Sequence, residues 1–166
     1  HRKLVDFLQT LSGLSFSELE TLAVSGERLG ELEVAEYARA QQLQVHSDAQ
    51  LRARHASLLE RLGRTEDAVD GYVSAARGTE LETTAASLFE SALRCLARAG
   101  GDAARGFNIA FEYAQALGFE EDRLTALLRF ATTKDDWLRL VQAIEDEFWR
   151  DARNDGFGDQ VAAWLY

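Results

Sequence analysis

Apolar residues recur at helical spacing along most of the chain. In "TAASLFESALRCLARAG", residues 84–100, one apolar set follows the i, i+3, i+4, i+7 rule that marks a single helix face. The segment "DDWLRLVQAIEDEFW", residues 135–149, repeats this spacing. Sustained alternation of apolar and polar residues, which would indicate half-buried strands, is missing. The pattern predicts an all-α protein.

Residues that start and stop helices divide this pattern into short segments. Three pairs fit a capping box at a helix start: Ser17 with Glu20, Ser47 with Gln50, and Thr79 with Glu82. Single N-caps are expected at Thr65, Asp102 and Thr133. Helices should stop at Gly30, Gly63, Gly78, Gly101 and Gly118. The expected helices are 2–11, 17–29, 31–45, 48–62, 66–77, 80–99, 103–117, 120–131, 134–150 and a short 159–166. Such short connections favour antiparallel packing of neighbours.

The tetrapeptide Glu-Arg-Leu-Gly occurs twice, at residues 27–30 and 60–63. With Gly30 aligned on Gly63, small residues match as well: Ala23 with Ala56, and Ala35 with Ala68. A repeat of this period is typical of stacked helix pairs. In such a stack the glycine makes the turn, and the alanines let two helices approach closely.

This pattern resembles the tetratricopeptide repeat (TPR), an antiparallel helix pair of roughly 34 residues. The residues of segment 49–82 that match it are Ala56, Leu59, Gly63, Ala68, Tyr72 and Ala75. Those of segment 16–48 are Leu19, Leu22, Ala23, Gly30 and Ala35. Arg39 takes a place where an aromatic residue is usual. Beyond residue 82 the match weakens, because the next turn glycine lies 37 or 38 positions after Gly63.

The resemblance implies a right-handed array of antiparallel helix pairs, a TPR-like α-solenoid. We expect a single helical-repeat domain over residues 1–166, with two TPR-like repeats at 16–82 and irregular helical hairpins at 83–166. The chain begins with His1 and stops within an apolar run. We therefore expect it to be excised from a longer chain.

Composition restricts the class of partner. The formal net charge is −10, which argues against nucleic acid as the partner because the phosphate backbone attracts basic surfaces. No apolar run approaches the roughly 18 residues of a membrane span, so membrane insertion is not expected. The single cysteine, Cys95, lies in a helical run, and we expect it to be a half-buried thiol. Because a single cysteine cannot form a disulfide within the chain, we expect a reducing compartment and a cytoplasmic location.

No group of residues indicates a reaction. The segment "DARNDGFGDQVA", residues 151–162, resembles a calcium loop at Asp151, Asp155, Gly156 and Asp159. However, Arg153 and Ala162 stand where ligands are needed, so a connector is the better interpretation. The acidic clusters at 120–122, 135–136 and 145–147 suit solvated helix ends. The three histidines lack metal spacing. We therefore predict no enzyme activity, no metal and no cofactor.

The resemblance implies a protein-interaction scaffold that binds a partner peptide or helix in the concave groove of the array. Its expected groove residues are Ser17, Glu20, Val24, Glu27, Arg28, Gln50, Ala53, Ser57, Glu60 and Arg61. The acids among them predict a basic or neutral partner. Two alternatives remain open: a solenoid segment of a larger assembly of the ciliary or vesicle-coat type, or a ligand-sensing domain. The aromatic C-terminal end is a candidate surface for homo- or hetero-oligomers.

Overall fold

The computed structural model describes residues 13–154, with side chains up to residue 150. It contains helices and no strand over this range, which confirms the all-α prediction. The expected helices 2–11 and 159–166 lie outside the described residues. The chain divides into two compact units between Gly100 and Gly101. This division falls at the glycine pair where the repeat pattern needed an insertion.

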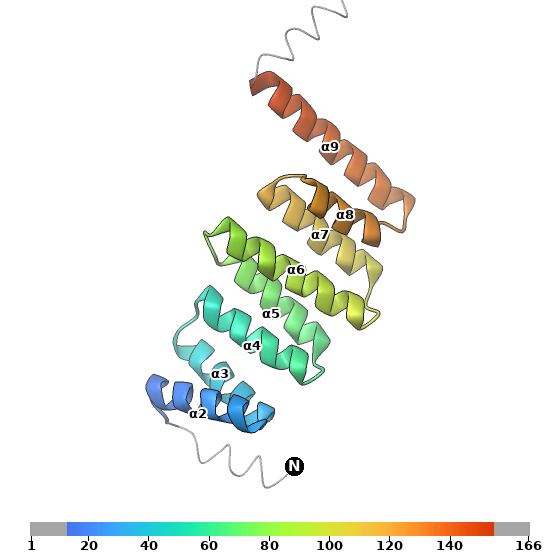
Figure 1. Cartoon of the computed structure of the whole chain (residues 1–166). Helices are drawn as coiled ribbons and strands as arrows, with labels where there is room; N and C mark the ends of the chain where they lie inside the picture. Colours follow the sequence, from blue (N-terminus) through green and yellow to red (C-terminus); the bar gives the residue numbers. More distant parts are fainter. Residues whose placement is uncertain (1–12, 155–166) are drawn as a thin grey trace, which may run out of the picture. The chain divides into compact units, whose positions relative to one another are not determined.

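Unit 1 consists of consecutive helices joined by short turns. Its helices are α2 (Phe16–Leu29), α3 (Leu32–Val45), α4 (Ala49–Arg61), α5 (Thr65–Arg77) and α6 (Glu82–Arg98). Each helix packs against the next in the sequence, and successive helices run in roughly opposite directions (Figure 1). The ends lie within two residues of the expected ones.

Buried small residues hold the first two helix pairs together. The matched alanines Ala23, Ala56, Ala35 and Ala68 are all fully buried, as the repeat predicts. A methyl group built on Gly71 of α5 would lie 2.8 Å from the Cβ atom of Ala56 in α4. Because atoms this close must shift, the α4–α5 crossing depends on the absence of a side chain there.

The position of the third turn glycine, Gly100, explains why the repeat match weakens beyond residue 82. Gly30, Gly63 and Gly100 all adopt positive φ, at 79°, 74° and 64°. Gly100, and not the expected Gly101, is thus the turn residue. It lies 37 positions after Gly63. Because α6 has 17 residues where α4 has 13, the four extra residues correspond to about one additional helical turn.

Several helix starts differ from the prediction. Ser15, not Ser17, caps α2, in a capping box with Glu18. Asp48, not Ser47, caps α4 through the backbone amide of Leu51. Neither α5 nor α6 has a side-chain cap, so the expected caps at Thr65 and Thr79 were wrong. Ser, Asp and Thr cap comparably well, and neighbouring candidates therefore cannot be separated by residue type.

Unit 2 contains α7 (Ala103–Leu117), α8 (Glu121–Phe130) and α9 (Lys134–Asn154). The predicted N-cap Asp102 is confirmed, since its side chain accepts a hydrogen bond from the amide of Ala104. Thr133 accepts one at 3.1 Å from the amide of Asp136. Helix α9 extends four residues beyond the predicted end at Arg150. Asp151 and Arg153 of the calcium-loop-like segment are therefore helical. The rest of that segment lies outside the described residues.

Candidate functional site

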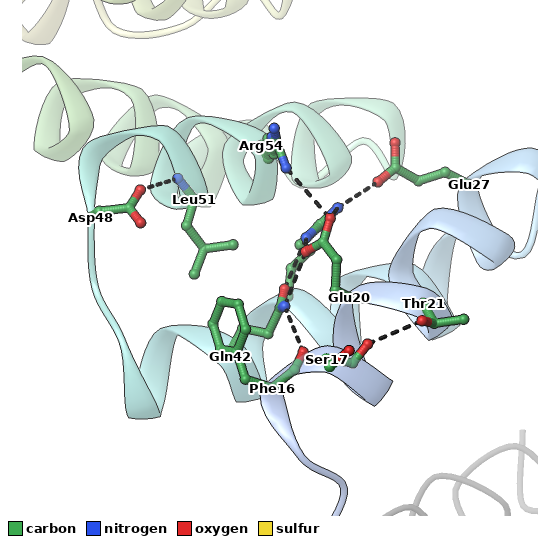
Figure 2. A network of polar contacts seen from close by, with 10 residues as sticks. Phe16, Ser17, Glu20, Thr21, Glu27, Gln42, Asp48, Leu51 and Arg54 are labelled. Atoms are coloured by element: carbon green, nitrogen blue, oxygen red, sulfur yellow. Dashed lines mark hydrogen bonds and ion pairs between the residues drawn. The ribbon is translucent and has the colours of Figure 1, made fainter.

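The predicted groove residues lie beside a polar network that is built around a buried arginine. Arg39 of α3 is only 2% exposed, and its guanidinium group bonds both carboxylate oxygens of Glu20 in α2. Figure 2 shows Glu20 within this network, with Gln42 and Arg54 directed toward it. The Nη1 atom of Arg39 also donates to Gln42 Oε1 at 2.9 Å. Gln42 in turn donates to Glu20 at 3.1 Å and to the carbonyl oxygen of Phe16 at 3.2 Å. The network therefore joins α2 to α3.

Two further arginines from α4 reach the same acids. Arg54 Nη1 lies 3.5 Å from Glu20 Oε1, and Arg61 Nη1 lies 4.0 Å from Glu27 Oε2. Glu27 Oε1 also lies 3.6 Å from Arg39. The hydrogen bond from Arg39 is the main cause that holds the pKa of Glu20 below its usual value, against the effect of burial. Glu20 is therefore ionised and paired within the chain at neutral pH.

The second helix pair repeats part of this arrangement, 33 positions later. Glu60 corresponds to Glu27 and accepts a hydrogen bond at 2.9 Å from Tyr72, which corresponds to Arg39. Arg98 of α6 lies 3.1 Å from Glu60, as Arg61 of α4 lies near Glu27. Each acid of the Glu-Arg-Leu-Gly tetrapeptide thus bonds the second helix of its own pair and the first helix of the next.

Burial and the bond to Glu60 raise the pKa of Tyr72 to about 12. The Tyr72 hydroxyl is therefore a neutral hydrogen-bond donor at neutral pH. Burial likewise raises the pKa of the Cys95 thiol. Because a thiol is nucleophilic only as the thiolate, a raised pKa offers no support for a reactive cysteine. The buried position agrees with the structural role predicted for Cys95.

The predicted groove residues are distributed over three hollows of unit 1. Five of them surround a hollow of about 500 Å³ between α2 and α4, together with Arg39 and Arg54. These five are Glu20, Val24, Glu27, Arg28 and Ser57. Glu60 and Arg61 line a second hollow of about 520 Å³ with Cys95 and Arg98. Gln50 and Ala53 line a third of about 640 Å³ near Leu81. Ser17 is exposed on α2 and lines none of the three.

Arginines balance the acids of the hollow between α2 and α4. Its lining contains Arg28, Arg39 and Arg54 against Glu20 and Glu27, so the formal charge is 3 − 2 = +1. Glu20 and Glu27, whose charges led us to expect a basic partner, are already paired with arginines of the same chain. Sequence reasoning noticed Arg39 only as a departure from the repeat pattern. Gln42 and Arg54 were not identified from the sequence as part of the network. The available signal was Arg39 itself, because an arginine at a repeat position that is usually aromatic and buried needs acidic partners nearby.

A smaller polar cluster lies between α3 and α4. Glu36 Oε1 is 2.9 Å from His55 Nε2 and 3.3 Å from Arg64 Nη1. The hydrogen bond to His55 is the main cause that holds the pKa of Glu36 below its usual value, against the effect of burial. The carboxylates of Glu20 and Glu36 are therefore both stabilised in their charged form.

Acid should therefore destabilise unit 1, in part through Glu36. Because its pKa is lower in the folded chain than in the unfolded chain, ionised Glu36 stabilises the fold above the unfolded-state pKa. That contribution is lost as the pH falls through the lower, folded-state pKa. We expect the melting temperature of the wild type to fall more steeply below about pH 4.5 than that of Glu36→Gln. Glu33→Gln, at an exposed position of the same helix, is the control. Parallel slopes for wild type and Glu36→Gln in thermal unfolding would contradict this role.

A hollow of about 740 Å³ lies between α7 and α9 of unit 2. Phe111 and Phe119 line it together with polar side chains that include Arg139, Gln142 and Asp146. Arg139 stacks on Phe111 with its guanidinium carbon 4.7 Å from the ring centre, and it donates to Asn108 at 3.0 Å. The late aromatics Trp137, Phe148 and Trp149 do not line this hollow.

Neither a metal site nor a membrane-spanning helix is present among the described residues. Among residues 13–154, no three His, Cys, Asp or Glu side chains gather as a metal site would require. None of the helices in the described part is both long and apolar enough to cross a membrane.

No protein-family model, curated protein or solved structure matches this chain. What the structure itself provides is a series of helices that pack in sequence, with ion-paired acids on α2 and α4. The TPR-like resemblance remains a prediction from the residues.

Proposed function

We propose that this protein is a non-catalytic, TPR-like scaffold of the cytoplasm that binds a partner protein between α2 and α4. The supporting observation is the hollow of about 500 Å³ that five predicted groove residues surround. These residues come from the first helices of two successive pairs, which are the helices that line the binding surface in arrays of helix pairs. The right-handed α-solenoid is part of the same proposal.

The occupant that fits this hollow best is an uncharged extended peptide or a neutral helix face. Val24 is 41% exposed and offers an apolar contact, and Ser57 is exposed beside it. Because Glu20 and Glu27 already bond Arg39, Arg54 and Arg61, a basic partner would have to compete with those arginines. This shifts the expectation from a basic or neutral partner to a neutral one.

Variants for testing the hollow must leave the ion pairs intact. Ser57→Trp fills the hollow from an exposed position on α4, and Val24→Ser removes its apolar contact. Ser17→Trp is the matched control, because Ser17 is also an exposed serine on the first helix of a pair but lies outside the hollow. Reversing the charge of Glu20, Glu27 or Glu60 is unsuitable, since each acid bonds side chains of its own chain.

We expect the wild type and Ser17→Trp to retain the same protein from native lysate, whereas Ser57→Trp loses it. The retained protein is then identified by mass spectrometry, purified, and titrated against each variant. The dissociation constant should rise at least about tenfold, or about 1.4 kcal/mol, for Ser57→Trp, because the new ring fills the hollow. It should rise several-fold, or about 1 kcal/mol, for Val24→Ser, because an apolar contact is lost. Equal affinities, with unchanged circular dichroism, would exclude this hollow as the binding site.

The second candidate, a segment of a larger multi-protein assembly, is favoured by a different observation. Helix α9 keeps a continuous row of apolar side chains exposed. Contiguous exposed apolar surface of this kind is typical of protein interfaces.

A further inference from the structure

Helix α9 carries an apolar stripe with the spacing of a helix–helix interface. The stripe consists of Trp137, Val141, Ile144 and Phe148, which are 46%, 51%, 41% and 52% exposed. Their intervals of four, three and four residues match the a and d positions of a heptad. Leu138 and Trp149 add exposed apolar surface beside it. Half of the twelve large apolar side chains that are exposed among the described residues therefore lie on this one helix.

The remainder of α9 is accounted for within unit 2. Leu140 is 3% exposed, and Arg139 lies over the rings of Phe107 and Phe111. The hollow between α7 and α9 includes Arg139, Ala143 and Glu147, but none of the four stripe residues. The helix thus contacts its own unit through one face and exposes the stripe on another.

The charges beside the stripe indicate the chemistry of its partner. Successive helical residues are offset by about 100°, so Glu145 lies on one side of Ile144 and Glu147 on the other. These two acids flank the C-terminal half of the stripe, and Glu147 pairs with Arg150 within the helix. The formal charge of the three side chains is 1 − 2 = −1. Acidic residues that flank an apolar seam select a partner with basic flanks.

We propose that the α9 stripe binds an amphipathic helix of another protein, with leucine or isoleucine at its a and d positions and lysine or arginine at the flanks. Charge disfavours the other occupants. A second copy of this chain would bring the same acids and a further net charge of −10. An anionic membrane surface would repel the flanking acids Glu145 and Glu147. The stripe lies in unit 2 and the α2–α4 hollow in unit 1, so the proposals stand or fall separately.

The test uses the whole chain and two synthetic helical peptides of 21 residues. Both have leucine at the a and d positions; one has lysine at the e and g positions and the other has glutamate. Binding is measured by isothermal titration calorimetry at low and at moderate salt. Ile144→Ser removes apolar contact from an exposed position, and Glu145→Lys reverses one flanking charge. Val45→Ser, at an exposed apolar residue of unit 1, is the control, because it leaves α9 unchanged.

We expect the lysine peptide to bind at least tenfold more tightly than the glutamate peptide, with a preference that shrinks as salt is raised. Ile144→Ser should weaken binding of the lysine peptide about tenfold, and Glu145→Lys should reduce its advantage over the glutamate peptide. Val45→Ser should change neither affinity. Equal binding of the two peptides would overturn the proposed partner chemistry. A concentration-dependent dimer in light scattering that Ile144→Ser abolishes would assign the stripe to a second copy instead. Binding to anionic vesicles in preference to the lysine peptide would assign it to a membrane.

Discussion

Replacing Arg39 by alanine is expected to lower the free energy of unfolding of unit 1 by about 3 kcal/mol, because removal of one partner of a buried ion pair leaves the other uncompensated. Arg39 is 2% exposed and bonds Glu20 and Gln42, while Glu27 lies 3.6 Å away. The variant would leave the carboxylate of Glu20 and the amide of Gln42 without this donor. It would also leave a cavity where the arginine stem packs.

The second helix pair supplies the matched control. Positions 20 and 39 correspond, 33 residues later, to Ala53 and Tyr72. The double variant Glu20→Ala/Arg39→Tyr therefore gives the first pair the side chains of the second, with Glu27 placed to accept from the new hydroxyl as Glu60 accepts from Tyr72. Because Arg39 Nε is buried without a partner in the described structure, the original network is not fully satisfied. We expect the double variant to lose less than about 1 kcal/mol.

Urea unfolding followed by two probes distinguishes the units. All three tryptophans, Trp137, Trp149 and Trp164, belong to the second unit. Tryptophan fluorescence therefore reports unit 2, whereas far-ultraviolet circular dichroism reports the helices of both. Arg28→Ala, at an exposed arginine of the same hollow, should stay within about 0.5 kcal/mol of the wild type. An Arg39→Ala variant as stable as Arg28→Ala would show that the network contributes nothing measurable.

Replacing Gly106 by alanine is expected to destabilise unit 2 by about 2 kcal/mol, although alanine is the better helix former by about 1 kcal/mol. A methyl group on Gly106 of α7 would lie 2.2 Å, 2.5 Å and 2.7 Å from three ring carbons of Phe130 in α8. Phe130 is itself 7% exposed, so the ring has little room to move. Overpacking of this kind usually costs 1–3 kcal/mol, and a contact as short as 2.2 Å lies at the severe end.

A double-variant cycle separates the clash from the effect of helix propensity. In the Phe130→Ala background the ring is gone, so Gly106→Ala should become neutral or stabilise unit 2 by up to about 1 kcal/mol. Gln115→Ala, at an exposed position of α7, should stay within about 0.5 kcal/mol of the wild type. Tryptophan fluorescence during urea unfolding gives the three values. A Gly106→Ala variant that is equally destabilising in both backgrounds would rule out the contact with Phe130 as the cause.

The elements that follow from local rules were predicted well. The expected N-cap Asp102 and the expected stop at Gly118 predicted a helix over residues 103–117, which is α7. The turn glycines Gly30 and Gly63 adopt the expected left-handed geometry. The matched alanines are buried as the repeat requires. Each of these features depends on residues within about one helical turn of one another, or on a period that the sequence itself displays.

The candidate site was predicted only in part. Five predicted residues share one hollow, but the remainder lie elsewhere. Glu20 was interpreted as a charge for a partner, whereas it bonds Arg39, 19 positions later in the sequence. Nothing local links these two positions. Glu20 is therefore part of the polar network that joins α2 to α3, and its charge is not free for a partner.

The sequence by itself determined that the chain is helical, where its helices end within a few residues, and which small side chains lie at the helix crossings, because backbone propensity and periodicity are local properties. Tertiary structure alone decided which charges neutralise one another, that Phe130 fills the space above Gly106, and that the apolar stripe of α9 is left exposed. An amphipathic pattern shows that a helix has an apolar face. Whether its own chain covers that face depends on distances between segments far apart in the sequence, which periodicity does not contain.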